Sequence, residues 1–161
     1  MKADYPSTPA VHFLRSKKIE FTPHLYPYEE HGGTGRAAAT LGVDEHMVVK
    51  TLVMQSDPRH PLLILMHGDR EVSTKELARA LGAKHVEPCD TLVAQKHTGY
   101  LVGGISPFGT RSQMPVYVER TILALPRIYI NGGRRGFLVE IAPQALQDAL
   151  AAQPVDVAIE S

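Results

Sequence analysis

The stretch MVVKTLVMQSDPRHPLLILM, residues 47–66, decides the fold. It holds two apolar runs, at residues 47–55 and 62–66, and a six-residue connection that contains Pro58 and Pro61. A prolyl turn of this kind suits the connection between two antiparallel strands. We therefore predict that the two runs are neighbouring strands of one sheet.

The sequence on either side of this pair mixes helical and strand patterns without a regular strand–helix–strand alternation. Capping residues and apolar stripes predict helices over residues 8–18, 36–41, 73–81, 90–96 and 143–150. β-Branched and aromatic runs predict strands over residues 19–28, 115–118, 127–130 and 137–141, and a short strand that begins at Val86. Pro23 and Pro27 place the first of these strands at a sheet edge. The mixture predicts an α+β fold around a mixed or antiparallel sheet, and Asn131-Gly132-Gly133 predicts a hairpin turn.

Length and composition describe one globular domain. The chain has 161 residues and a mass of 17.6 kDa, and 43% of its residues are hydrophobic and 21% charged. These values exclude a disordered chain, a collagen-like repeat and a long coiled coil. Seventeen basic residues balance seventeen acidic ones, which excludes a wholly basic nucleic-acid coat and a polyacidic tail. We expect residues 1–161 to form a single domain.

The cysteine content and the apolar runs predict a cytoplasmic protein without a membrane segment. The one cysteine, Cys89, has no intrachain disulfide partner, and residues 1–6 do not resemble the apolar core of a signal peptide. The longest clean apolar run, residues 62–66, is far shorter than the ~20 residues that a spanning helix requires.

Lys50 interrupts an apolar strand face. With the two-residue period of a strand, it shares that face with Val48, Leu52 and Met54. Two explanations stay open: an edge-strand lysine that discourages aggregation, or an amine directed into a pocket. Because desolvated lysines serve catalysis and anion binding, Lys50 is a candidate active-site residue.

Two glycine-rich motifs resemble catalytic signatures without meeting their requirements. Residues 33–38 fit the loose dinucleotide fingerprint, but a polar segment precedes them where a buried strand is required. Residues 104–109 approach the nucleophile elbow, but Pro107 has no N–H for an oxyanion and Phe108 replaces the second glycine. The sequence thus argues against a Rossmann site and against acylation of Ser106. Whether Gly103 and Gly104 wrap a ligand or form a plain turn stays open.

The sequence predicts neither a metal centre nor a reactive thiol. Its eight histidines form no H-E-x-x-H or H-x-H motif, and a single cysteine cannot build a thiolate zinc site. Asp90 disfavours the thiolate of Cys89, although a helix N-terminus there would favour it.

Basic residues concentrate in the second half of the chain. Residues 91–141 contain six basic and two acidic side chains, a surplus of four positive charges. The segment also contains both later glycine-rich loops, which suits an acidic partner such as RNA phosphate. A solvated arginine-rich face explains the charge equally well.

With these residues considered together, the chain resembles the YbaK family of bacterial aminoacyl-tRNA deacylases, in particular its Cys-tRNA(Pro) deacylase branch. The landmarks are Thr8-Pro9-Ala10-Val11, Lys50-Thr51-Leu52, residues 80–84, residues 98–109 and Gly132-Gly133-Arg134-Arg135-Gly136. The family is similar to the editing domain of bacterial prolyl-tRNA synthetases. The resemblance implies a curved mixed sheet with flanking helices and hydrolysis of mischarged tRNA(Pro).

The resemblance also implies the site residues. Lys50 matches the family's active-site lysine, and Gly103, Gly104, Ile105, Ser106 and Pro107 match the loop that lines the aminoacyl pocket. Tyr26 lies where members carry a tyrosine near that pocket. Leu138 departs from the pattern, because relatives commonly place an aspartate there.

The implied chemistry requires no metal and no cofactor. In a cysteinyl ester the substrate's own thiol can attack its carbonyl and close a thiolactone, while Lys50 offsets negative charge and loop amides face the carbonyl. The expected partner is a charged tRNA(Pro), which a prolyl-tRNA synthetase could deliver. Two alternatives remain: a deacylase of another specificity, such as Ala-tRNA(Pro), and a non-catalytic module that binds RNA or a small ligand.

Overall fold

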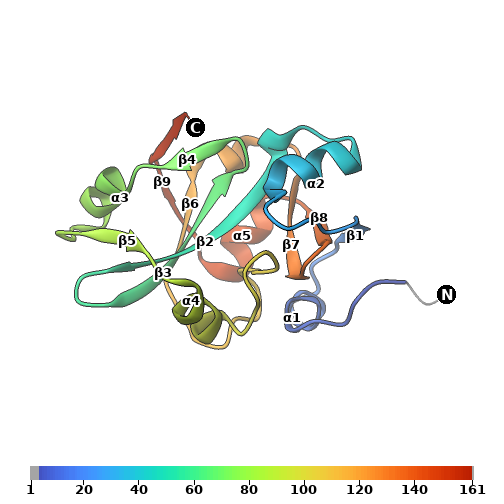
Figure 1. Cartoon of the computed structure of the whole chain (residues 1–161), viewed down its shortest axis with the longest axis horizontal. Coiled ribbons are helices and arrows are strands. Elements are labelled where there is room, and N and C mark those ends of the chain that lie inside the picture. The colour runs from blue at the N-terminus through green and yellow to red at the C-terminus, as the bar shows by residue number, and fades with distance from the viewer. Residues whose placement is uncertain (1–3, 161) are drawn as a thin grey trace.

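The computed structural model describes residues 4–160 and contains the predicted hairpin in the middle of a sheet (Figure 1). Strand β2 (Val48–Ser56) pairs antiparallel with β3 (His60–His67), from Val49 opposite His67 to Ser56 opposite His60. The prediction made from residues 47–66 is confirmed.

The sheet is mixed, and its strand order is β1-β8-β7-β2-β3-β6-β9, with β5 also paired to β2. Its other strands are β1 (Thr22–Leu25), β5 (Val86–Pro88), β6 (Val116–Glu119), β7 (Ile128–Arg134), β8 (Phe137–Ile141) and β9 (Gln153–Val155). The pairs β2–β7, β3–β6 and β6–β9 are parallel, and the other pairs are antiparallel. Strand β1 forms one edge, as its prolines predict. The α+β fold class is therefore confirmed.

The helices begin and end close to the predicted positions. They are α1 (Pro9–Ser16), α2 (Gly33–Leu41), α3 (Thr74–Leu81), α4 (Thr91–Thr98) and α5 (Gln144–Leu150), with 3-10 turns η1 (Glu45–Met47) and η2 (Arg120–Ala124). Thr8, Ser73 and Asp90 accept hydrogen bonds from first-turn N–H groups. Gly42 and Gly82 end α2 and α3 with φ of 70° and 71°. Within residues 4–160, no helix has the length and apolarity needed to cross a bilayer.

The last hairpin turns later than predicted. Strand β7 continues through Asn131-Gly132-Gly133 to Arg134, and the chain reverses at Arg135 and Gly136. The register shifts between Asn131 and Arg134 because the Asn131 Oδ1 accepts hydrogen bonds from the N–H groups of Gly133 and Arg134. The predicted turn residues therefore form a bulge inside the strand.

The two faces of the sheet are covered differently. Helices α1, α4 and α5 pack on one face and enclose the main apolar core. On the other face, α2 packs over Val48 and Leu138, and α3 packs over Met54 and Ile64. Helices α2 and α3 lie far apart (Figure 1). The small sheet of β4 (Arg70–Val72) and β10 (Ala158–Glu160), which the sequence did not predict, adjoins this face.

Candidate active site

The sheet opens beside the middle of β2. On the side away from β3, Val48 and Val49 pair with β7, and residues from Met54 to Ser56 pair with β5. No strand of residues 4–160 pairs with the intervening residues 50–53 on that side. A cavity of about 810 Å³ occupies the opening, with walls from β2, α2, β4, α4, the segment after β1 and the loop at 102–105. Its volume suits a small-molecule-sized ligand.

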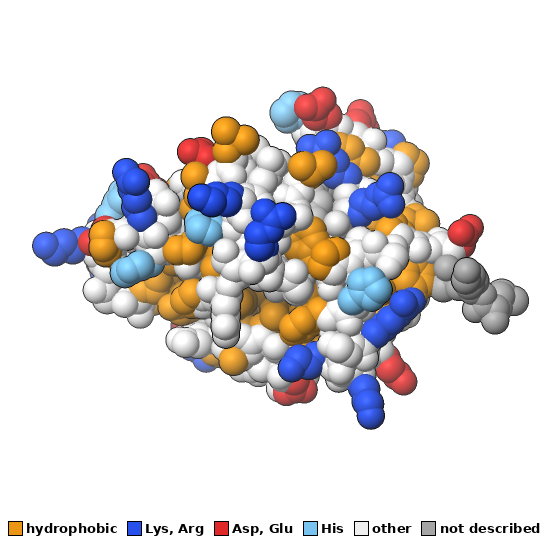
Figure 2. Space-filling view, turned by 90° about the horizontal axis from the view of Figure 1, so that it is seen from below, with side chains coloured by type: hydrophobic (Ala, Val, Ile, Leu, Met, Phe, Trp, Pro, Cys, Tyr) orange, Lys and Arg blue, Asp and Glu red, His pale blue; other side chains and the backbone are white. Residues whose placement is uncertain are grey.

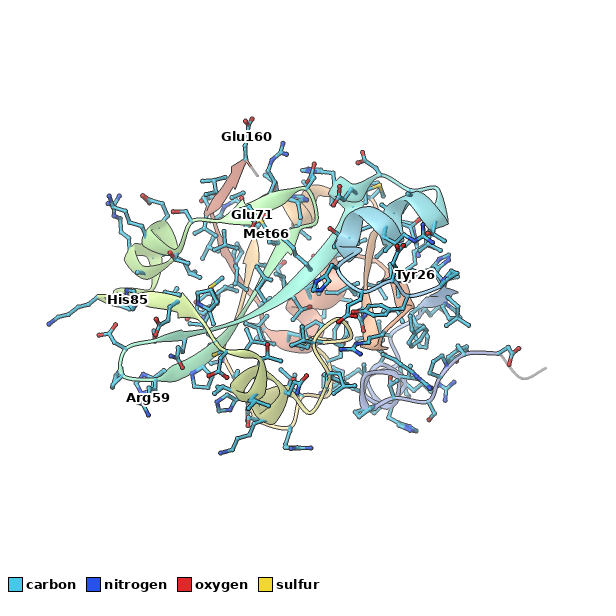
Figure 3. All side chains as sticks on the ribbon, viewed as in Figure 1. Tyr26, Arg59, Met66, Glu71, His85 and Glu160 are labelled. Carbon is cyan, nitrogen blue, oxygen red and sulfur yellow. The ribbon has the colours of Figure 1, made fainter. Side chains whose placement is uncertain are left out.

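Lys50 lines this cavity from an otherwise apolar stretch of β2. Its side chain is 21% exposed, and its Nζ lies 3.7 Å from Oε1 of Glu71 on β4; Figure 3 labels Glu71. Because β2 is an interior strand, the edge-strand explanation of Lys50 does not apply. The Glu71 side chain is 56% exposed, so solvent weakens this ion pair. The Lys50 ammonium is thus available to an anionic or electron-rich group in the cavity.

Thr51 carries a buried hydroxyl without a partner. Among residues 4–160, its Oγ1 is the one buried side-chain nitrogen or oxygen that makes no hydrogen bond. The Val53 carbonyl accepts from the N–H of Cys89, the residue after β5, and backbone groups alternate in direction along a strand. The main-chain N–H and C=O of Thr51 therefore also face the opening. Because a buried polar group without a partner costs free energy, Thr51 is a candidate ligand contact.

The glycine-rich loop approaches other chain segments so closely that two of its positions require glycine. Gly103 has φ of +95°, and a Cβ there would lie 2.6 Å from the Tyr28 hydroxyl. A Cβ on Gly104 would lie 2.7 Å from the main-chain nitrogen of Arg135. The Asn131 Nδ2 also donates to the Gly103 carbonyl at 3.3 Å. The loop is thus held against β7 and the turn that follows it.

The structure brings only part of the predicted loop to the cavity. Gly103 and Ile105 line it, together with Tyr26 and Lys50. Gly104, Ser106 and Pro107 are buried and do not line it. The Ser106 Oγ accepts a hydrogen bond from the Phe108 N–H at 3.1 Å, which stabilises the bend of the loop.

Tyr26 and Leu138 contribute an apolar wall. Leu138 is buried with Ala37, Ala38 and Val48, and Tyr26 packs against the same cluster. Burial, and then the neighbouring Tyr28, raise the pKa of the Tyr26 hydroxyl, so it stays protonated at neutral pH. Tyr26 is labelled in Figure 3. With leucine at position 138, this wall holds no carboxylate.

Cys89 lines the cavity but is poorly suited to nucleophilic attack. Burial, together with the charges of Asp90 and Glu87, raises the pKa of the Cys89 thiol. Because the thiolate is the reactive form, the thiol is unreactive at neutral pH.

A histidine pair that no sequence motif reveals lies outside the cavity. The His46 and His67 rings stack with their centroids 3.7 Å apart, and the His46 Nδ1 lies 2.8 Å from Asp69 Oδ1. These three side chains could offer atoms to a metal. However, the His67 Nδ1 donates to the His46 carbonyl and its Nε2 accepts from the Thr121 hydroxyl. Because both ring nitrogens of His67 are engaged, we assign the cluster a structural role.

Comparison with known proteins identifies the family. Residues 31–149 match the aminoacyl-tRNA editing domain family. The chain belongs to this family. The matched residues include β2, α4, the glycine-rich loop and the β7–β8 hairpin. Residues before 31, including Tyr26 and Tyr28, lie outside the family match, but they line the same cavity as residues inside it.

Several known proteins align with most of this chain. A protein of Enterococcus faecalis named "Putative Cys-tRNA(Pro)/Cys-tRNA(Cys) deacylase EbsC" is 30% identical over 146 residues, which cover 90% of this chain and 89% of that protein. A proline–tRNA ligase of Caldicellulosiruptor bescii is 25% identical over 78% of this chain and 20% of the ligase. A solved structure described as "a putative trans-editing enzyme for prolyl tRNA synthetase" has the same fold, with a TM-score of 0.84, 22% identity and coverage of 95% and 98% of the two chains.

Proposed function

We propose that this editing domain is a trans-acting deacylase that hydrolyses Cys-tRNA(Pro) and releases cysteine from the tRNA 3′ end. The observation that carries the proposal is the cavity in the sheet opening, where Lys50, Thr51 and the glycine-rich loop meet. The family, the deacylase name of the Enterococcus faecalis relative and the similarity to part of a proline–tRNA ligase support it. Residues 1–161 would then act as one domain, on charged tRNA in the cytoplasm, with prolyl-tRNA synthetase as a partner that could deliver it.

In the proposed reaction the substrate supplies the nucleophile. The cysteinyl sulfur attacks the ester carbonyl and forms a C–S bond, the bond from that carbon to the ribose oxygen breaks, and the ribose oxygen takes up the thiol proton. Water then opens the thiolactone to cysteine. Lys50 stabilises the negative charge that develops on the carbonyl oxygen, and a main-chain N–H of the loop can do the same. Ser106 and Pro107 hold the loop in shape rather than contact the substrate.

Cys89→Ala and Ser106→Ala should each retain substantial turnover, because neither side chain provides the nucleophile. Ser106→Ala should also lower the free energy of unfolding by about 1 kcal/mol, since the Phe108 N–H loses its acceptor. Mass spectrometry during turnover and thermal unfolding provide the two measurements. An acyl-enzyme trapped on either residue would contradict this mechanism.

Thr51→Val should stabilise the fold and impair the reaction. Valine has the shape of threonine but no hydroxyl, so the variant loses a buried polar group that has no partner and should gain about 1 kcal/mol. If the hydroxyl bonds the substrate, the deacylation rate should fall about 10-fold, as expected for one hydrogen bond. Chemical denaturation and single-turnover kinetics test both parts.

Thr98→Val is the matched control, because the buried Thr98 hydroxyl donates to the Ala94 carbonyl and accepts from the Tyr100 N–H. This variant should lose stability. An unchanged rate in a folded Thr51→Val protein would remove Thr51 from the site.

Deacylation of a panel of charged tRNAs by the purified protein tests the function itself. We expect Cys-tRNA(Pro) to be hydrolysed fastest, with equal rates before and after treatment with EDTA. Faster hydrolysis of Ala-tRNA(Pro) would show that alanine, not cysteine, is the preferred aminoacyl group. Loss of turnover in EDTA with recovery in zinc would overturn the metal-free mechanism. Absence of turnover on every charged tRNA would favour a binding module.

A further inference from the structure

The mouth of the cavity carries an aromatic ring stacked with an arginine. The Tyr28 side chain lies beside the glycine-rich loop, as its close approach to Gly103 shows, and 38% of the residue is exposed. The guanidinium carbon of Arg135 lies 5.2 Å from the centre of the Tyr28 ring. The Arg135 Nε donates to the Val102 carbonyl at 3.0 Å, which fixes this arginine against the loop. Tyr28, Val102, Gly103 and Arg135 all line the cavity.

Arginines around the loop differ from most others in the chain in having no acidic partner. Within residues 4–160, no carboxylate lies at ion-pair distance from Arg111, Arg134 or Arg135. Arg111 lies beside Gly99 at the start of the loop, whereas Arg134 and Arg135 lie beside Gly104 and Gly103 at its end. Five other arginines pair with Glu29, Asp69, Glu76, Asp156 and Glu140, whereas Arg15 and Arg59, elsewhere in residues 4–160, also have no carboxylate at ion-pair distance.

One face of the molecule gathers more basic than acidic side chains at its centre (Figure 2). Figure 2 shows basic side chains both in the middle and at the outline of this face, whereas the acidic side chains lie at its outline. Exposed apolar side chains also border the loop, at Leu101 and Val102. A positive surface with exposed aromatic and apolar groups suits an anion that carries a planar base.

We propose that Tyr28 and Arg135 form the binding site for the terminal adenosine of the charged tRNA, a proposal that rests on the proposed function. The adenine base stacks on the Tyr28–Arg135 pair, and the adjoining phosphate lies near the arginines at the end of the loop. Stacking on aromatic rings and guanidinium planes is the usual means of holding an unpaired base. The ester carbonyl then extends from the ribose toward Lys50 inside the same cavity.

The size of the cavity agrees with this occupant. A volume of about 810 Å³ is in the range that holds drug-sized ligands. An aminoacyl group alone is much smaller than such a ligand, whereas an aminoacyl-adenosine has that size. The cavity therefore has room for the terminal nucleoside as well as for the amino acid attached to it.

Kinetics of Tyr28 variants on Cys-tRNA(Pro) test the proposal. Tyr28→Ala should raise KM about 10-fold with kcat changed less than twofold, because it removes a stacked ring that contacts ground state and transition state alike. Tyr28→Phe keeps the ring and should restore the KM of the unaltered protein. Leu92→Ala is the control, because Leu92 is 78% exposed on α4 and does not line the cavity.

Competition by adenosine 5′-monophosphate provides a measurement that a purely structural role of Tyr28 would not change. The nucleotide should inhibit the unaltered protein and Tyr28→Phe, and should inhibit Tyr28→Ala about 10-fold less strongly. Equal inhibition of all three proteins, inhibition by inorganic phosphate alone, or a Tyr28→Ala variant that loses kcat without a change in KM would overturn the proposal. If the unaltered protein deacylates none of the charged tRNAs, the proposed function itself is refuted.

Discussion

Lys50→Ala should lower the single-turnover rate of Cys-tRNA(Pro) deacylation by roughly 100-fold or more, comparable with the loss of one oxyanion donor. The ammonium of Lys50 is the positive charge that β2 directs into the cavity, and the Lys50 side chain is only 21% exposed. A charge in such surroundings stabilises an oxyanion more strongly than the same charge in water. Circular dichroism should show a folded variant, because the Lys50 ion pair with Glu71 is partly exposed and contributes little stability.

Lys50→Arg separates a positioned amine from a general positive field. It keeps the charge but changes the length and donor geometry of the side chain. A large fall in the deacylation rate of Lys50→Arg would show that the amine must occupy a defined position. A small fall would show that a positive charge near the ester is sufficient. Glu71→Gln is the companion variant, because it removes the charge partner and leaves Lys50 in place. A folded Lys50→Ala protein with a near-normal rate would refute the assignment.

Gly104→Ala should reduce deacylation about 100-fold while the protein stays folded. The new Cβ would lie 2.7 Å from the Arg135 nitrogen and 2.8 Å from the Arg134 carbonyl carbon, so backbone atoms must move. Gly104 does not line the cavity, but its neighbours Gly103 and Ile105 do. A displacement of the loop moves its amides relative to the ester carbonyl, and misplacement by about 1 Å can cost about 100-fold in rate. Single-turnover deacylation and circular dichroism provide the measurements.

Gly82→Ala is the control for this variant. Gly82 ends α3 with φ of +71°, and a Cβ at this position would have no other atom within 4 Å, so the substitution strains the backbone without a collision. It should lower the free energy of unfolding by about 1 kcal/mol and leave deacylation unchanged. Gly104→Ala with the rate of the unaltered protein would show that the loop tolerates the displacement and does not position the substrate.

Local patterns in the sequence determined the elements of this fold. The apolar runs at 47–55 and 62–66 identified β2 and β3, and the residues Thr8, Ser73 and Asp90 identified three helix starts. These predictions succeed because strand period and helix capping depend on residues within a few positions of one another. The three-residue strands β4, β9 and β10 were missed because so short a run carries no usable period, and β5, which is equally short, was located only by its first residue.

Lys50 was visible in the sequence as a charge on an apolar strand face, and the resemblance to deacylases gave it a role. The sequence could not tell whether its strand was an edge strand or an interior one. That depended on the pairing of β2 with β7 and β5, which come from distant parts of the chain. Long-range pairing also creates the opening in the sheet, since β7 leaves β2 after Val49 and β5 joins it only at Met54.

The sequence by itself determined the α+β class, most of the elements, the central hairpin and the lysine that the cavity holds. Only the tertiary structure decided that the Thr51 hydroxyl is left without a partner, that Glu71 reaches Lys50, and that Arg135 stacks on Tyr28. The reason is physical: the period of a strand fixes which face a side chain occupies, whereas burial and hydrogen bonding depend on which distant segments meet that face.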